Sequence, residues 1–347
     1  MTLLIRGARQ LITAQGSAGP RRGTCLSDLR IIPAGAVLIR DGRIEQVGPA
    51  SRVERLEAAR KARPIDAFGR VVMPGFVDPL SRPLSGPLLA TRESARKAMA
   101  GYSSQRMEIE AGRRISAAAR QGVTTAGAGC GYCASPERER KALRVLAKLN
   151  GRDANIVGQY HALGAEAAAE PGLWNSLVAK KLAAAAVSPS PETCAAATAA
   201  GLRAIRLHPG FADSGPVRIL LPGEAYHGEA PYPPARQWIE QGMPVALATG
   251  FDLCSCPIAS MPMILSLACA QMRMTPEQAI LASTVNAAHA LAAGALCGSI
   301  EAGKRADILI LETGDYRDAV YLAGQNPVAL AIVAGKPLGP RDEFRVD

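Results

Sequence analysis

Aromatic residues are scarce in this chain of 347 residues. Phenylalanine, tryptophan and tyrosine make up 4% of the sequence, and Trp174 and Trp238 are the only tryptophans. A surface on which nucleic-acid bases stack needs aromatic side chains, so this composition argues against one. The formal net charge is +10, but the basic residues occur as pairs such as Arg113-Arg114 and never in the runs of about five that mark a nucleic-acid-binding tail. The sequence therefore does not favour nucleic acid as a partner.

Long apolar runs and targeting signals are also missing. The longest apolar stretches, residues 261–270 and 287–297, are shorter than the roughly 20 residues that span a bilayer. The start of the chain turns polar at Arg6, before the apolar core of a secretory signal could form. Eight cysteines in a chain of this length are not the dense disulfide framework of a small secreted domain. These absences predict a cytoplasmic protein that does not bind membranes.

Apolar residues make up 48% of the chain, which is enough for a large core. Residues 36–48 alternate in polarity around the turn Asp41-Gly42, and this predicts a β-hairpin. The continuous apolar run 71–79 predicts one buried strand. Beyond it, apolar runs such as 123–128 alternate with helical stretches such as 92–121. This alternation predicts an α/β fold with a parallel sheet, open or closed into a barrel.

Several motifs, spread along the chain in a consistent order, resemble those of a known family. They are Asp41-Gly42-Arg43-Ile44, residues 72–79, residues 286–291 and residues 298–307. On these motifs the chain resembles the amidohydrolase superfamily, and within it most closely imidazolonepropionase, the cyclic-amide hydrolase of histidine breakdown. The resemblance implies a (β/α) TIM-type barrel over residues 67–298 and a composite β-sandwich built from residues 1–66 and 299–347.

The same resemblance implies one zinc or iron ion, which activates a water molecule for attack on a ring amide. Its ligands would be a His-x-His pair ending the first barrel strand, a histidine ending a later strand and an aspartate ending the last. Here the pair reads Leu80-Ser81-Arg82, and Gly250 replaces the aspartate, which leaves His208 alone. A single imidazole does not hold a divalent ion that takes three or more protein ligands. The sequence therefore predicts no metal and no other cofactor at this site, with Asp252 as the one candidate for a substitute ligand.

A second departure from the family lies between His208 and Leu220, which only residues 209–219 separate. The family places a helix, a strand and another helix there. One β/α unit is therefore expected to be missing, and the barrel could have seven strands, stay open or be closed by another segment. Because two different family strands could align here, His208 is either the candidate catalytic residue or a satisfied core histidine.

Three further side chains are candidates for a substrate-binding site at the mouth of the barrel. By the resemblance, Tyr132 and His161 match positions that contact substrate, although both also fit a strand end where hydrogen bonds to neighbours satisfy them. Arg82 is the third candidate. A buried arginine needs a partner, and the choices are Asp78, Asp252 or an anionic ligand.

Cysteines offer a different metal site. Cys130 and Cys133 lie on one loop and Cys254 and Cys256 on another, and the family brings these loops to the same end of the barrel. Four thiolates could bind zinc or an iron–sulfur cluster. The alternatives are that the cysteines are small buried hydrophobic residues, or that one of them is a nucleophile near His161.

Three hypotheses about function follow. The first is a relative of imidazolonepropionase that has lost metal-dependent hydrolysis and binds a small cyclic-amide-like ligand or supports a related amidohydrolase as a partner subunit. The second is an active hydrolase of cyclic amide or amidine C–N bonds with a rebuilt site around Tyr132, His161, His208 and Asp252. The third is a structural or nucleic-acid-associated role that draws on the charge of +10. We expect a homo-oligomer or a complex with a related amidohydrolase.

Overall fold

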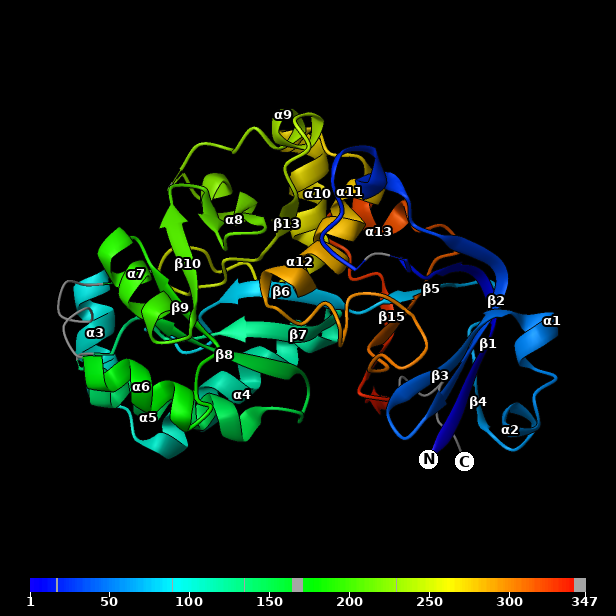
Figure 1. Ribbon diagram of the computed structural model, residues 1–347, viewed down its shortest axis with the longest axis horizontal. Coiled ribbons are helices and arrows are strands. Elements are labelled where there is room, and N and C mark those ends of the chain that lie inside the picture. Colours follow the sequence, from blue (N-terminus) through cyan, green and yellow to red (C-terminus); the bar gives the residue numbers. More distant parts are fainter. Residues whose placement is uncertain (17, 89, 134, 164–170, 229, 340–347) are drawn as a thin grey trace.

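The computed structural model describes residues 1–16, 18–88, 90–133, 135–163, 171–228 and 230–339. Its strands form two eight-stranded sheets (Figure 1). The terminal sheet, built from both ends of the chain, has the order β16-β15-β14-β5-β1-β2-β3, with β4 paired to β1. Its strands are β1 (Thr2–Ile12), β2 (Ile31–Arg40), β3 (Arg43–Pro49), β4 (Arg63–Asp66), β5 (Val71–Pro74), β14 (Ile308–Leu311), β15 (Val328–Val333) and β16 (Lys336–Leu338).

The terminal sheet contains the predicted hairpin. Strands β2 and β3 pair antiparallel on either side of Asp41-Gly42, and these two residues have φ angles of 49° and 78°. Two positive φ angles are what a two-residue type I′ turn requires, so the prediction is confirmed. Ile5, Val37 and Ile310 are buried in one core, which shows that the two ends of the chain fold as one unit.

The second sheet is the barrel, with the order β6 to β13. Its strands are β6 (Phe76–Ser81), β7 (Val123–Ala128), β8 (Asn155–His161), β9 (Ala185–Ser188), β10 (Arg203–His208), β11 (Phe211–Asp213), β12 (Arg218–Leu220) and β13 (Val245–Leu247). Backbone hydrogen bonds join β6 to the segment after β13: Gly250 donates to Leu80 over 3.1 Å, and Arg82 donates to Phe251 over 2.7 Å. The predicted α/β barrel is confirmed and is nearly closed.

The short connection after β10 explains how the barrel closes. Strand β11 is antiparallel to both β10 and β12, whereas the other neighbouring strands of this sheet are parallel. The chain passes from β10 to β12 through β11 without a helix. Of the three alternatives left open by the sequence, the structure therefore shows closure by another segment.

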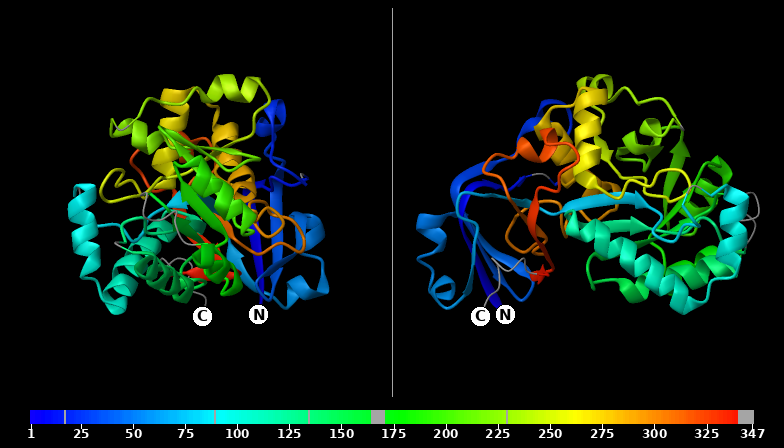
Figure 2. Two further views of the ribbon diagram at one scale, coloured as in Figure 1. Left: turned by 60° about the vertical axis from the view of Figure 1, so that its left-hand side comes forward. Right: turned by 180° about the vertical axis from the view of Figure 1, so that it is seen from behind.

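Helices lie on the outer side of the barrel sheet (Figure 2). Ser103, Ser135 and Ser190 accept backbone N–H groups at the starts of α4, α5 and α7, as N-cap residues do. The barrel region contains the helices α3 (Arg92–Ala100), α4 (Ser104–Arg120), α5 (Pro136–Leu149), α6 (Pro171–Ala179), α7 (Pro191–Ala199), α8 (Pro222–Tyr226), α9 (Ala235–Glu240), α10 (Met261–Met272), α11 (Pro276–Ala282) and α12 (Val285–Ala290). The others are α1 (Ala50–Val53), α2 (Glu57–Arg60), α13 (Asp318–Tyr321) and the 3₁₀ turn Gly23–Ser27. In the described part of the chain, no helix has both the length and the apolar character to cross a bilayer.

Two predicted elements were wrong in detail. The apolar run 71–79 is two strands, with β5 in the terminal sheet and β6 in the barrel. The change of sheet occurs at Gly75, where a Cβ would lie 2.1 Å from the Thr124 hydroxyl, so only glycine permits this approach. The predicted helix 92–121 is broken into α3 and α4 at a new N-cap. The β-sandwich domain was predicted to consist of residues 1–66 and 299–347. Because β5 joins the terminal sheet, that sheet extends past residue 66. Residues 340–347 lie outside the described residues.

Candidate functional site

Four side chains from three strand ends and one loop meet at the carboxyl end of the barrel strands. Arg82 follows β6, Tyr132 follows β7, His161 ends β8, and Asp252 lies five residues beyond the end of β13. The carboxyl ends of barrel strands are where enzymes of this architecture place their active sites. The structure therefore brings the three predicted binding residues together with one of the predicted partners of Arg82.

Arg82 is the centre of this arrangement. Its Nη1 lies 2.9 Å from Asp252 Oδ2, and its Nε donates to His161 Nδ1 over 3.1 Å. The exposed fractions are 7% for Arg82, 0% for Asp252 and 3% for His161. A guanidinium removed from water to this extent requires an opposite charge and further hydrogen bonds, and Asp252 and His161 supply them.

Asp252 is satisfied on both carboxylate oxygens. The Tyr132 hydroxyl donates to Oδ2 over 2.6 Å, and the Cys254 backbone N–H donates to Oδ1 over 2.8 Å. Burial and the neighbouring Asp252 carboxylate raise the pKa of Tyr132 above its ordinary range. Tyr132 therefore remains a protonated donor and holds Asp252 in place.

His161 is held in one tautomer. Because Nδ1 accepts from Arg82, the proton lies on Nε2, which donates to Gln159 Oε1 over 3.3 Å. Gln159 in turn donates to the Pro79 carbonyl over 2.8 Å. Burial, together with the charge of Arg82, lowers the pKa of His161 well below its ordinary value. The imidazole is therefore neutral, and both of its nitrogens are engaged.

Asp78 joins the first and last barrel strands below this group. It accepts hydrogen bonds from the Thr249 backbone N–H over 3.0 Å and from the Thr249 hydroxyl. Burial raises the pKa of Asp78 to about 6, although the Thr249 hydrogen bonds act in the opposite direction. Asp78 is thus a strand-joining carboxyl, and Arg82 pairs with Asp252 instead.

His208 occupies a different environment. Its ring stacks on Phe211, with centroids 4.6 Å apart and planes 9° from parallel, and Phe211 contacts Trp238 edge-on. Among the described residues, no hydrogen bond joins His208 to Arg82 or to its partners. The structure thus places the predicted catalytic histidine in an aromatic cluster at the β10–β11 turn, and its catalytic role stays a prediction.

The residues at the family's metal positions do not fit a divalent ion. Leu80 is buried in an apolar core with Val187 and Ala246, and it offers no donor atom. Arg82 carries a positive charge, and Gly250 has no side chain. Zinc and iron take imidazole, carboxylate or thiolate ligands, none of which these three positions supply. The side chains at positions 80, 82 and 250 therefore cannot together coordinate the metal that the resemblance implies.

The four cysteines do not converge as expected for a four-thiolate site. Cys130 Sγ and Cys133 Sγ are 3.3 Å apart, but Cys254 and Cys256 direct their thiols at the carbonyls of Pro87 and Thr249. The hydrogen bond that Cys133 donates to Cys130, together with burial, raises the pKa of Cys133, and burial raises that of Cys256 to about 12. These thiols remain protonated, which argues against a nucleophilic cysteine.

A pocket of about 470 Å³ opens beside the Arg82 group. Its lining includes two guanidinium groups and one carboxylate. Reasoning from the sequence missed Arg92, Glu224 and Gln159. Of these three, only Gln159 could have been identified from the sequence, because it lies two positions before His161 and therefore on the same face of a strand. The pocket is lined by Arg82, Ala90, Arg92, Tyr132, Pro209, Glu224, Cys254 and Ser255.

Comparisons with known proteins agree with this architecture. The model of the Amidohydrolase family matches residues 159–338. Among solved structures, guanine deaminase from E. coli superposes with a TM-score of 0.73 at 14% identity and covers 99% of this chain and 100% of its own. Guanine deaminase from Bradyrhizobium japonicum gives a TM-score of 0.72 at 15% identity, with the same coverage. The chain belongs to the amidohydrolase family, and at these identities the structures support the fold alone.

Sequence comparison with curated relatives identifies the branch of the family that this chain resembles. Imidazolonepropionase from Solibacter usitatus (strain Ellin6076) is 34% identical, with 94% of this chain and 96% of the relative covered. Imidazolonepropionase from Geobacillus kaustophilus (strain HTA426) is 31% identical, with 96% and 97% covered. The first alignment runs over 404 positions, more than the 347 residues of this chain. This chain is imidazolonepropionase-like, and it lacks segments that the relative contains.

Proposed function

We propose that this protein has lost metal-dependent hydrolysis and binds a small cyclic-amide-like ligand that carries a carboxylate. One observation carries the proposal. A buried guanidinium, held by Asp252 over 2.9 Å and by His161 over 3.1 Å, stands where the resemblance expects a metal-binding histidine. A guanidinium has no lone pair to offer a metal ion, and here Asp252 already balances its charge, so this position does not supply a metal ligand.

The remaining polar groups suit binding better than proton transfer. A general base needs a free lone pair at the reacting atom, but Nδ1 of His161 already accepts from Arg82. The raised pKa of Tyr132 keeps its proton in place. In an active hydrolase built on Tyr132, His161, His208 and Asp252, the first, second and fourth of these residues would have to leave this hydrogen-bonded group before they could accept a proton, and His208 lies outside the group.

The residues that line the pocket support a ligand of this kind. Arg82 and Arg92 can attract a carboxylate, and Glu224 can accept from a ring N–H. Imidazolone propionate has both features, a cyclic amide and a carboxylate. Service as a partner subunit of a related amidohydrolase is the second part of the proposal, and it would use the same preserved fold.

Titration calorimetry with imidazolone propionate, together with an assay of its hydrolysis, tests the proposal. We expect binding without turnover. Arg92→Ala should weaken binding about tenfold, the loss of one charge-assisted hydrogen bond of about 1.5 kcal/mol. Arg113→Ala, at an exposed position on α4, is the matched control and should bind like the unmodified protein. Turnover that a chelator abolishes would overturn the loss of hydrolysis, and absence of binding would overturn the ligand assignment.

A further inference from the structure

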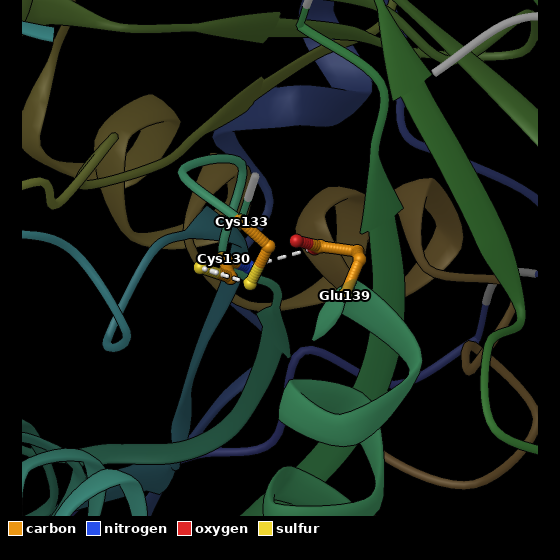
Figure 3. A group of neighbouring side chains, drawn as sticks. All are labelled: Cys130, Cys133 and Glu139. Atoms are coloured by element: carbon orange, nitrogen blue, oxygen red, sulfur yellow. Dashed lines mark hydrogen bonds between the residues drawn. The ribbon is translucent and has the colours of Figure 1, made fainter. Parts of the chain in front are cut away.

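A second group of polar side chains lies outside the Arg82 network. Cys130 and Cys133 follow β7, and Glu139 lies on α5 shortly after that loop. One candidate ligand atom from each residue lies within 4.8 Å of the other two. Figure 3 shows both thiols and the carboxylate turned toward one another. We propose that Cys130, Cys133 and Glu139 bind a thiophilic divalent cation of the zinc type.

The environment of Glu139 is the first argument. This carboxyl is only 4% exposed, and its backbone partners are the neutral N–H groups of Cys130 and Gly131, at 3.3 to 3.4 Å. Among the residues that the structure describes, no arginine, lysine or histidine forms an ion pair with Glu139. A buried carboxylate is costly without an opposite charge, and a bound cation would provide it.

The donor set is the second argument. Two cysteine sulfurs and one carboxylate oxygen are ligands that zinc prefers, and three protein ligands leave a fourth position for water. Two sulfurs about 2.3 Å from a tetrahedral zinc lie about 3.8 Å apart, whereas these two are 3.3 Å apart. To bind zinc, the two sulfurs would therefore have to move apart by about half an ångström. Each thiol exchanges its S–H bond for an S–metal bond and releases the proton to solvent.

The position of the group suggests what such an ion would do. Tyr132 lies between the two cysteines in sequence, and its hydroxyl holds Asp252. A cation on both flanking thiols would fix the loop that carries Tyr132. This inference goes beyond the proposed function, because the ion would lie apart from positions 80, 82 and 250, where the resemblance places the lost metal ligands.

The test measures metal in the purified full chain after zinc loading and exhaustive dialysis. We expect about one zinc per chain in the unmodified protein and a loss of that zinc in Cys133→Ser. Cys269→Ser is the matched control, because Cys269 is also partly buried but lies on α10; this variant should keep its zinc. Cobalt substituted for zinc should show a sulfur-to-metal charge-transfer band, which Cys130→Ser should reduce.

A further variant distinguishes the loss of a metal ligand from misfolding of the protein. Glu139→Gln keeps the shape of the side chain while removing its charge. It should weaken zinc binding by at least the 10–100-fold typical of a lost supporting group, with an unchanged circular dichroism spectrum. Absence of stoichiometric zinc in the unmodified protein would overturn the inference, and so would as much zinc in Cys133→Ser and Glu139→Gln as in the unmodified protein. The proposed function fails on a different result, chelator-sensitive turnover, so the two failures can be told apart.

Discussion

The two ends of the barrel each contain an arginine paired with a buried aspartate, and the pairs differ in their surroundings. At the amino end of the strands, Arg305 lies 2.7 Å from Asp307, which also accepts from the backbone N–H of Ala334 over 2.8 Å. Arg305 also donates to Thr125, near the start of β7. This pair joins the terminal sheet to the barrel, whereas the Arg82–Asp252 pair lies at the carboxyl end beside a pocket.

The two arginine–aspartate pairs lie at ends of the barrel that have different roles. In barrels of this type, the amino end of the strands serves stability and the carboxyl end serves activity. Arg305 and Asp307 belong to the segment 298–307, where the sequence keeps the family's pattern. Arg82 stands where that pattern is lost. The same pair of residue types therefore joins the two sheets at one end and, at the other, lies where the resemblance expects metal ligands.

The largest expected effect comes from breaking the pair at the carboxyl end. Asp252→Ala leaves the Arg82 charge buried without a partner, so the free energy of unfolding should fall by about 3–5 kcal/mol. Urea denaturation measures this loss. Adding Arg82→Met to the same variant should recover most of it, because an apolar pair of similar size avoids the buried charge. A loss below about 1 kcal/mol in Asp252→Ala would mean that water reaches Arg82.

The next effect concerns pH and Asp78. The pKa of this carboxyl is about 6 in the fold, against a reference value of 3.8, so between these values the folded protein binds more protons than the unfolded chain. The free energy of unfolding should therefore fall by about 3 kcal/mol as pH rises through this window, and Asp78 should add no dependence above it. Asp78→Asn should remove that contribution. Equal pH profiles of unfolding for the two proteins would contradict the assignment.

A smaller effect is expected at the amino end. Asp307→Asn removes the charge opposite Arg305, but Arg305 is 22% exposed and can reach water. The loss in unfolding free energy should be about 1–3 kcal/mol, the cost of a poorly satisfied buried group, and ligand binding should not change. Calorimetric titration of the variant checks the second point. A large change in ligand affinity would contradict the separation of the two ends.

The smallest effect is at Tyr132. Tyr132→Phe removes one hydrogen bond to Asp252 and should reduce stability by about 0.5–1.5 kcal/mol. Thermal unfolding at neutral pH measures this change. A cost larger than that of Asp252→Ala would show that Tyr132, and not Arg82, is the main partner of Asp252.

Local patterns predicted the fold better than they predicted the site. The turn at Asp41-Gly42 and the alternation of strands and helices depend on neighbouring residues, so the sequence showed them. The division of 71–79 into two strands depends on Gly75 and Thr124, which are far apart in sequence. The sequence likewise did not show whether Asp78 or Asp252 is the partner of Arg82, because that depends on the directions of the side chains.

The cysteines show the same limit. Their spacing placed two pairs near one end of the barrel, but side-chain direction decides which thiols meet. Cys130 and Cys133 face Glu139, a residue whose role the spacing of the cysteines did not suggest. Contacts of this kind appear only once the helix that carries the glutamate is placed beside the loop.

An anomalous difference map from zinc-soaked crystals, recorded at the zinc absorption edge, would locate every zinc ion that this protein binds. We expect no peak within bonding distance of the side chains at positions 80, 82, 208 and 250, with the Arg82 guanidinium still on Asp252. We expect a peak beside Cys130, Cys133 and Glu139. A zinc peak at the carboxyl ends of the barrel strands, ligated by His208 or Asp252 with Arg82 displaced, would contradict the loss of the metal-dependent site.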